Sequence, residues 1–360
     1  MKKAIFVMRF LILIMSLALV LSVKSTQDEN DEQISSISVN VKENHRLKLS
    51  DIAQDVKRIE LEFGEESSFG RVRRLQVYND SIFVLGLHDN LLVFDNKGKY
   101  SRQIGRPWKS RSLGSNFSDF SIDAADGALY ISTSNNDILK FDNQNRVFSI
   151  SGVRPARAGI YSIDGQLIVF SYQFLEKTDL GLRNQTEMFI CSPETGSIDS
   201  LIVTRTYPKM PMFSFSTTYD FVSRVADDIY VYVPVLDPET IVRDTVYRFH
   251  DNKLLPALKL KFSNEGELND SGLKSVELEK IWLAGDYVFA EYTYKREKYI
   301  YCHDFRTGKG VNTKQGIRDD IFHCGTVEIR PLGNDMFYYT HQKEGTEGEK
   351  NPDIYIGKFK

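Results

Sequence analysis

A pair of short apolar segments, separated by a polar break, recurs six times along the chain. The first segments of the pairs read DSIFVLGL (80–87), DGALYIST (126–133), DGQLIVFS (164–171), DDIYVYVP (227–234), GDYVFAEY (285–292) and GNDMFYYT (333–340). Their Tyr, Phe, Val and Ile residues suit half-buried strands, and the Asp and Gly residues that precede them suit turns. Asp80 and Asp335 stand 255 residues apart, so five repeats average about 51 residues each. The pattern predicts six repeated units built from strand pairs.

Each pair is preceded by a further strand candidate, and five of the six pairs are followed by one. The preceding strands are predicted at 72–77, 117–122, 160–163, 219–225, 276–283 and 326–329. The chain beyond its N-terminal region has no sustained 3.6-residue apolar period, so an α/β fold is excluded, and only 49–54 is expected to form a helical turn. The sixth unit lacks an outer strand, while the alternating segment 56–62 lacks a unit. The sequence therefore predicts an all-β, six-bladed β-propeller over 47–360, closed by 56–62 pairing with 353–359.

The N-terminus has the pattern of a targeting segment. Lys2, Lys3 and Arg9 precede an apolar run over 10–21, interrupted only by Ser16. This order predicts a signal peptide over 1–22, followed by a flexible lead-in over 23–46, and an exported protein that is periplasmic or at the cell surface. The alternative is an uncleaved anchor, but the run is shorter than the roughly 20 apolar residues of a spanning helix. We therefore expect no transmembrane helix in the mature chain.

Charge and cysteine content narrow the classes of partner. Removal of 1–22 takes away three of 46 basic residues, which leaves 43 against 49 acidic residues, a net charge of −6. This acidic balance does not support nucleic-acid binding. Among the three cysteines, only Cys302 and Cys324 could form a disulfide, because Cys191 and Cys302 fall two predicted blades apart. Three buried free thiols and a monomeric protein are the favoured expectation.

Two segments carry a family resemblance: LKLSDIAQDVKRIELEF (47–63) and LLVFDNKGKYSRQIGR (91–106), in which Gly98 turns the chain between two strands. With them the chain resembles, over roughly 35–360, a secreted six-bladed β-propeller family abundant in Gram-negative gut bacteria, and more distantly the NHL-repeat propellers. Members of that family usually continue with a glycine- and proline-rich loop. Here PWKSRSLGSNFSDF (107–120) replaces it and lacks the Gly-Pro-Gly-Glu-Tyr core. The resemblance implies export and a propeller, without an established reaction.

Five carboxylates lie in or beside the predicted inner strands: Asp119, Asp220, Glu277, Glu279 and Glu328. If at least three converged, they could bind Ca²⁺ or act as an acid/base pair; otherwise they are solvated or paired with cations such as Arg73, Arg74 and Arg224. The chain has no Gly-x-Ser-x-Gly, His-Glu-x-x-His, phosphate loop or Cys-x-x-Cys. No catalytic residue, metal site or cofactor is therefore assigned.

The loop that contains Trp108 between Arg106 and Arg111 is the sharpest local candidate for binding. An indole among cations can stack on a sugar or hold an anionic group, or it can cap the apolar end of a blade. The predicted ligand-binding residues are Arg106, Trp108, Arg111, Asp119, Asp220, Trp282 and Glu328. For Trp282, late in an inner strand, packing between blades is the favoured alternative. The favoured function is an exported binding or scaffold module for a carbohydrate or protein partner. The alternative is an enzyme at the channel mouth, a Ca²⁺-assisted hydrolase or lyase acting on a glycan or lactone.

Overall fold

A computed structural model describes residues 34–86, 90–105, 117–134, 137–141, 147–150, 159–208, 220–233, 240–264, 266–342 and 350–360. One compact unit spans Ile37–Lys360. The predicted signal peptide over 1–22 and the predicted binding residues Arg106, Trp108 and Arg111 lie outside the described residues.

Six sheets of four or five strands, and a small sheet of two strands, make up the described part of this unit. The first three sheets comprise β3 (Val72–Tyr78), β4 (Ser81–Gly86), β5 (Leu91–Asp95) and β6 (Tyr100–Ile104); β7 (Phe117–Ile122), β8 (Leu129–Thr133), β9 (Ile138–Phe141) and β10 (Val147–Ile150); and β11 (Gly159–Ile163), β12 (Gln166–Thr178), β13 (Gly181–Cys191) and β14 (Ile198–Thr206). Within each of these sheets, consecutive strands pair antiparallel.

The other sheets draw on both ends of the unit. They comprise β15 (Val222–Val225), β16 (Asp228–Val231), β17 (Thr245–His250) and β18 (Lys253–Phe262) with β1 (Ser35–Val39); β19 (Val276–Ala284), β20 (Tyr287–Tyr294), β21 (Glu297–Asp304) and β22 (Lys309–Lys314); β25 (Arg330–Gly333), β26 (Met336–His341) and β27 (Asp353–Phe359) with β2 (Ala53–Ile59); and the small sheet of β23 (Ile317–Asp319) with β24 (Gly325–Val327). A single turn of helix, α2 (Leu49–Ile52), precedes β2.

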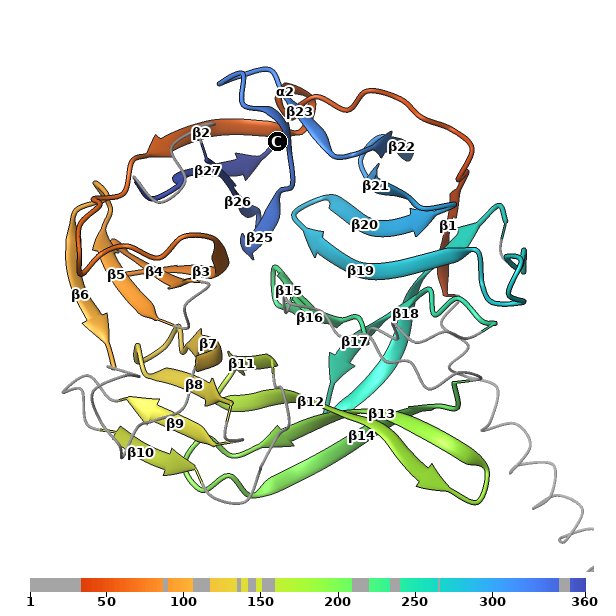
Figure 1. Cartoon of the computed structure of the whole chain (residues 1–360), viewed down its shortest axis with the longest axis horizontal. Helices are drawn as coiled ribbons and strands as arrows, with labels where there is room; N and C mark the ends of the chain where they lie inside the picture. The colour runs from red at the N-terminus through yellow and green to blue at the C-terminus, as the bar shows by residue number, and fades with distance from the viewer. Residues whose placement is uncertain are drawn as a thin grey trace, which may run out of the picture. The chain divides into compact units, whose positions relative to one another are not determined.

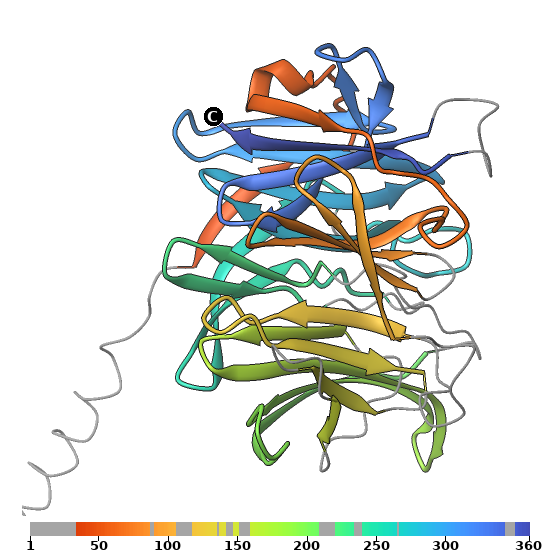
Figure 2. The same ribbon diagram turned by 90° about the vertical axis from the view of Figure 1, so that its left-hand side faces the viewer.

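The sheets follow one another around a common centre (Figure 1), with β3, β7, β11, β15, β19 and β25 innermost. In Figure 2, which is turned by 90°, many of the strands are seen lengthwise; these strands run roughly parallel to the viewing direction of Figure 1. Successive antiparallel sheets of this kind, arranged around an axis, are the architecture of a β-propeller. The all-β class predicted from the sequence is therefore what the structure shows.

The N-terminal strand completes the last sheet. β2 pairs antiparallel with β27, so that Ala53 lies opposite Phe359 and Ile59 opposite Ile354. The prediction placed this strand at 56–62, but it begins at Ala53 and bulges between Gln54 and Lys57. The register with β27, rather than the local alternation of side chains, sets these limits.

The predicted flexible lead-in over 23–46 differs from the structure in its second half. β1 is hydrogen-bonded to β18, and Ile37 and Val39 are buried between sheets. The side-chain amide of Asn312 in β22 donates to the backbone carbonyls of Asn40, at 3.3 Å, and Glu43, at 3.0 Å. The alternation of Ile37, Val39 and Val41 with polar residues is a strand pattern, and the acidic residues before it hid that pattern in the sequence.

The inner strand of the last sheet also differs from its prediction at 326–329. Residues Gly325–Val327 form β24, which pairs with β23, and the inner strand is β25, four residues later. The carboxylate of Asp319, at the end of β23, accepts hydrogen bonds from the backbone N–H of Ile321 and Phe322, both at 2.9 Å, and of Cys324, at 3.3 Å. Asp319 therefore holds the turn that makes β23 and β24 a separate hairpin.

The core is divided among the interfaces between neighbouring sheets. Trp282 on β19 is 1% exposed and stacks on Phe289, with ring centres 4.1 Å apart. Phe359 of β27 packs against Phe289, with ring centres 5.4 Å apart, and so joins the fifth sheet to the sixth. Apolar side chains on facing sheets thus provide the contact that a single sheet cannot make alone.

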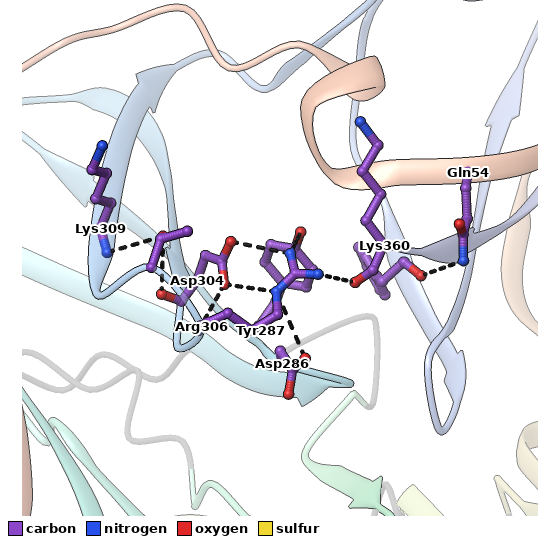
Figure 3. A network of polar contacts seen from close by, with 9 residues as sticks. Gln54, Asp286, Tyr287, Asp304, Arg306, Lys309 and Lys360 are labelled. Atoms are coloured by element: carbon purple, nitrogen blue, oxygen red, sulfur yellow. Dashed lines mark hydrogen bonds and ion pairs between the residues drawn. The ribbon is translucent and has the colours of Figure 1, made fainter.

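A polar network at the edge of this interface also joins the two sheets (Figure 3). The Arg306 guanidinium donates to the Asp304 carboxylate at 3.1 Å and to the Lys360 carbonyl at 2.7 Å. It also donates to the Tyr287 hydroxyl and lies 5.0 Å from the centre of that ring. The turn that follows β21 is in this way fixed to the residue that follows β27.

The three cysteines are free, but only two of them are buried: Cys324 is partly exposed, whereas the sequence predicted three buried thiols. Cys191 and Cys302 are buried, and burial raises the pKa of Cys191 to about 11 and also raises the pKa of Cys302. Because only the thiolate reacts, we expect neither thiol to be labelled by a disulfide reagent at pH 8 in the native protein, while Cys324 reacts slowly. Three thiols should react after denaturation. Rapid native labelling of two or more would contradict this packing.

Candidate functional site

Side chains of one inner strand hold the backbone of the next one. The N–H of Ile122 donates to Gln76 Oε1 at 2.9 Å, and the N–H of Ser162 donates to Ser121 Oγ at 2.8 Å. Between the third and fourth sheets, the N–H of Phe221 donates to the Tyr161 hydroxyl at 2.9 Å. Buried backbone groups need partners, and these side chains provide them where no neighbouring strand does. They therefore fix the spacing of the inner strands around the centre.

A cavity of about 240 Å³ lies among the inner strands. Its lining comes from all six of them and lies mainly in their second halves, toward the turns that lead to the second strands. Val77 and Gly333, both in the lining, are exposed, so the cavity opens to solvent at this end. Its polar lining includes Arg74, Gln76, Ser121, Tyr161, Asp220 and Arg224.

Asp119 lies behind the residues that line the cavity and is not itself a lining residue. Its side chain is fully buried, and its Oδ2 atom is 2.6 Å from Arg74 and 2.9 Å from the N–H of Ile160. Burial raises the pKa of Asp119 to about 6, although Arg74 and the N–H of Ile160 oppose the rise. The Arg74 guanidinium also lies 4.6 Å from the centre of the Tyr161 ring. The predicted ligand residue Asp119 therefore positions Arg74 in the cavity wall.

Asp220, a predicted ligand-binding residue, lines the cavity. Its Oδ2 atom is 3.7 Å from the ammonium of Lys280, which is closer, at 2.9 Å, to Glu291. This Oδ2 atom is buried and accepts no hydrogen bond from any described residue. A buried carboxylate oxygen without a hydrogen bond is costly, and the charge of Lys280 offsets part of that cost; the Asp220 side chain as a whole is 12% exposed, so the carboxylate can still meet a ligand in the cavity.

The five predicted carboxylates do not converge on one point. Asp119 pairs with Arg74, and Glu328 pairs with Lys298 at 2.7 Å, away from the cavity lining. Burial would raise the pKa of Glu328, but the hydrogen bond and charge of Lys298 lower it overall. Within the described ranges, no three His, Cys, Asp or Glu side chains are placed to hold a metal ion.

Trp282 is a core residue and cannot contact a ligand in this conformation. It is buried against Phe289, whereas the next residue, Leu283, lines the cavity. Neighbouring residues of a strand point to opposite faces, so the sequence identified the correct strand but could not tell which face meets the cavity. Tyr161 and Tyr338 were missed, because tyrosines in a strand pattern read as core; only their place beside charged inner-strand residues could have signalled the site.

The rim of the cavity carries a further ion pair. Arg224 of β15 lies 2.5 Å from Asp164, which follows β11, and both side chains are partly exposed. The cavity therefore presents a cation at its mouth and a second one, Arg74, in its wall. Together with the Asp220 carboxylate, these side chains offer hydrogen-bond donors and an acceptor to one small ligand.

The arrangement of sheets and the central cavity define a β-propeller-like protein. A family model described as a domain of unknown function (DUF4934) matches residues 32–351, so the chain belongs to this family. No functionally curated protein matches the chain in sequence. Among the described residues, no helix is long and apolar enough to cross a bilayer.

Solved structures resemble the chain in fold. A protein from Bacteroides fragilis that is classed as exported has 16% identity and a TM-score of 0.59, over 91% of this chain and 100% of that one. The Neurospora crassa Pan2 WD40 domain has 10% identity and a TM-score of 0.42, over 80% and 75% of the two chains. The β-propeller domain of Cps50 (Swd1) from Myceliophthora thermophila has 12% identity and a TM-score of 0.40, over 82% and 99%. Of these three, only the Bacteroides structure supports the fold.

Proposed function

We infer that the chain is an exported six-bladed β-propeller, its ring closed by β2, that binds a carbohydrate residue in the central cavity. The observation that carries this proposal is the partly exposed carboxylate of Asp220 in a cavity that also presents Arg74 and Tyr161. A sugar hydroxyl can donate to a carboxylate and accept from a guanidinium, while the ring of a tyrosine contacts its apolar face.

The size of the cavity supports a small ligand. At about 240 Å³, it is smaller than the roughly 300–1,000 Å³ of sites for drug-sized molecules. One sugar residue, free or at the end of a chain, fits this limit better than a folded partner, which would have to bind across the rim. The enzyme alternative depended on converging carboxylates, and the pairing of Asp119 and Glu328 with cations takes that support away.

Export is supported by the basic and apolar N-terminal pattern around Lys2, Lys3 and 10–21. The Bacteroides fragilis protein with a similar fold is also classed as exported. Detection of a mature N-terminus close to residue 23 by mass spectrometry would support the proposal, and an intact Met1 in the cytoplasmic fraction would contradict it.

A panel of neutral and acidic monosaccharides and disaccharides, titrated calorimetrically, tests the binding site. We expect at least one to bind with a stoichiometry of one, and Asp220→Asn to weaken that binding about tenfold or more, since one lost hydrogen bond to a charged group is worth about 1.5–3 kcal/mol. Asp251→Asn is the matched control, because the Asp251 side chain is 84% exposed elsewhere on the surface.

Two outcomes would contradict the proposed site: no sugar of the panel binds, or Asp220→Asn binds as tightly as the unchanged protein. The melting temperatures of both variants, measured in parallel, separate a loss of the site from a loss of the fold. A folded Asp220→Asn variant that loses binding would support the site directly.

A further inference from the structure

The outer edges of several sheets are covered by the N-terminal part of the chain. β1 lies on the outer edge of β18, and β2 lies on that of β27. Between these strands, the N–H of His45 donates to the Asn312 carbonyl of β22 at 2.8 Å. The fourth, fifth and sixth sheets are therefore protected from pairing with other chains, as natural sheet edges usually are.

The outer edge of the third sheet, formed by the long strand β14, is not covered in this way by any described strand. β14 runs for nine residues, whereas the outer strands β6 and β10 have five and four. It lies at the outside of the ring of sheets (Figure 1), and its apolar Ile198 and Leu201 are each 46% exposed. A long, partly apolar edge is a template for a further strand.

The sequence of β14 is complementary to itself. In an antiparallel pair with a second copy, centred on Ile202, residue 199 lies opposite residue 205 of the partner subunit. Asp199 then faces Arg205 of the partner subunit, and Leu201 faces Val203 of the partner subunit. Two-fold symmetry repeats both pairs. No other centre along the strand places the two charges opposite each other.

Both charged side chains, Asp199 and Arg205, are exposed along β14. The register between β13 and β14 shifts at Cys191, so Asp199 has no opposite residue on β13. The Nε–H of Arg205 donates to Gln185 Oε1 at 2.9 Å. This bond does not use the two terminal nitrogens of the guanidinium, and the Arg205 side chain is exposed. The bond to Gln185 therefore holds the Arg205 guanidinium in place beside β14, from where it can extend to the partner strand.

We propose that this chain forms a two-fold symmetric homodimer by antiparallel pairing of β14 with β14 of a second copy, in the register that sets Asp199 opposite Arg205. This inference goes beyond ligand binding in the central cavity and replaces the expectation of a monomer. A nine-residue edge buries less surface than a standard interface, so the dimer is reversible, with a Kd on the order of 10 µM.

Sedimentation velocity over about 1–200 µM, a range that brackets such a Kd, tests the proposal. The unchanged chain should shift from monomer to dimer, and Leu201→Lys, which puts a charge from each copy into the apolar centre of the strand pair, should stay monomeric. Leu180→Lys is the matched control, because Leu180 lies between β12 and β13 of the same sheet, 78% exposed and off the edge. It should dimerise normally.

A charge exchange distinguishes this register from any other. Asp199→Arg and Arg205→Asp should each weaken self-association about tenfold, since each sets two like charges opposite each other. An equimolar mixture of the two variants should dimerise again, because both cross-strand pairs are then restored in the heterodimer.

Three results would overturn the proposal: a monomer throughout the range, a dimer that Leu201→Lys leaves intact, or no recovery in the mixture. Far-ultraviolet circular dichroism of each variant confirms that its sheets are formed. Because none of these residues lines the central cavity, sugar binding should be unchanged in every variant, so failure here is distinct from failure of the proposed ligand site.

Discussion

Deletion of residues 1–62 is expected to abolish cooperative folding of the rest of the chain. The deleted segment includes β1 and β2, which cover the outer edges of two sheets, and His45, whose N–H donates to β22 of a third sheet. It also removes eight buried apolar side chains: Ile37, Val39, Val41, Leu47, Leu49, Ile52, Ala53 and Leu61. At roughly 1.5–3 kcal/mol for each of the larger ones, the loss is about 10 kcal/mol or more. This is as large as the whole stability of a typical domain.

The matched control is deletion of residues 1–33, which ends just before the first described residue. Both shortened chains are produced without export and compared by thermal melting and gel filtration. The shorter deletion should give a cooperative transition, and the longer one should give aggregated or unfolded material. Equal melting temperatures for the two would show that β2 is dispensable and that the ring is not closed by it.

Replacement of Asp319 by Asn should lower the free energy of unfolding by about 2–4 kcal/mol at pH 7. Asp319 is 2% exposed and accepts three backbone N–H bonds and the Tyr339 hydroxyl, at 3.0 Å. An amide turns one acceptor into a donor that faces other donors, and each buried group left without a partner costs about 1–3 kcal/mol. The turn between β23 and β24 loses its organising group.

The same substitution has a defined pH dependence. Burial would raise the pKa of Asp319, but the hydrogen bonds from Phe322, Ile321, Tyr339 and Cys324 outweigh it and lower the pKa overall. Its stabilisation is therefore present above the unfolded pKa of about 3.9 and lost as the pH falls through the lower folded value. Urea unfolding should show a difference between Asp319→Asn and the unchanged protein at pH 7 that shrinks toward pH 3. A difference that is absent at pH 7, or that grows in acid, would contradict this role; Asp251→Asn, at an exposed site, should show none.

The local features of the fold could be predicted from the sequence. The inner strand expected at 117–122 is β7, and the one expected at 276–283 is β19 with one further residue. These strands are marked by apolar alternation and by turn residues at their ends, which depend only on the neighbouring sequence. The spare strand also indicated a pairing with Asp353–Phe359, which β2 makes.

Features that depend on distant partners could not be predicted. β25 contains Pro331 and Gly333, which read as turn residues, yet pairing with β26 makes the segment a strand. Arg74 and Asp119 were both noted as charged candidates, but nothing local shows that residues 45 apart form a buried pair. Which face of β19 is turned to the cavity, and hence the opposite roles of Trp282 and Leu283, likewise depends on the neighbouring sheets.

The most direct test of the central claim is a crystal structure of the mature protein with the sugar of the panel that binds most tightly. The account predicts six sheets around one axis, with β2 as the outer strand of the last. It places a sugar hydroxyl within hydrogen-bond distance of the Asp220 carboxylate, and the sugar in contact with Arg74 and Tyr161. A sugar bound elsewhere, with the central cavity filled only by water, would contradict it.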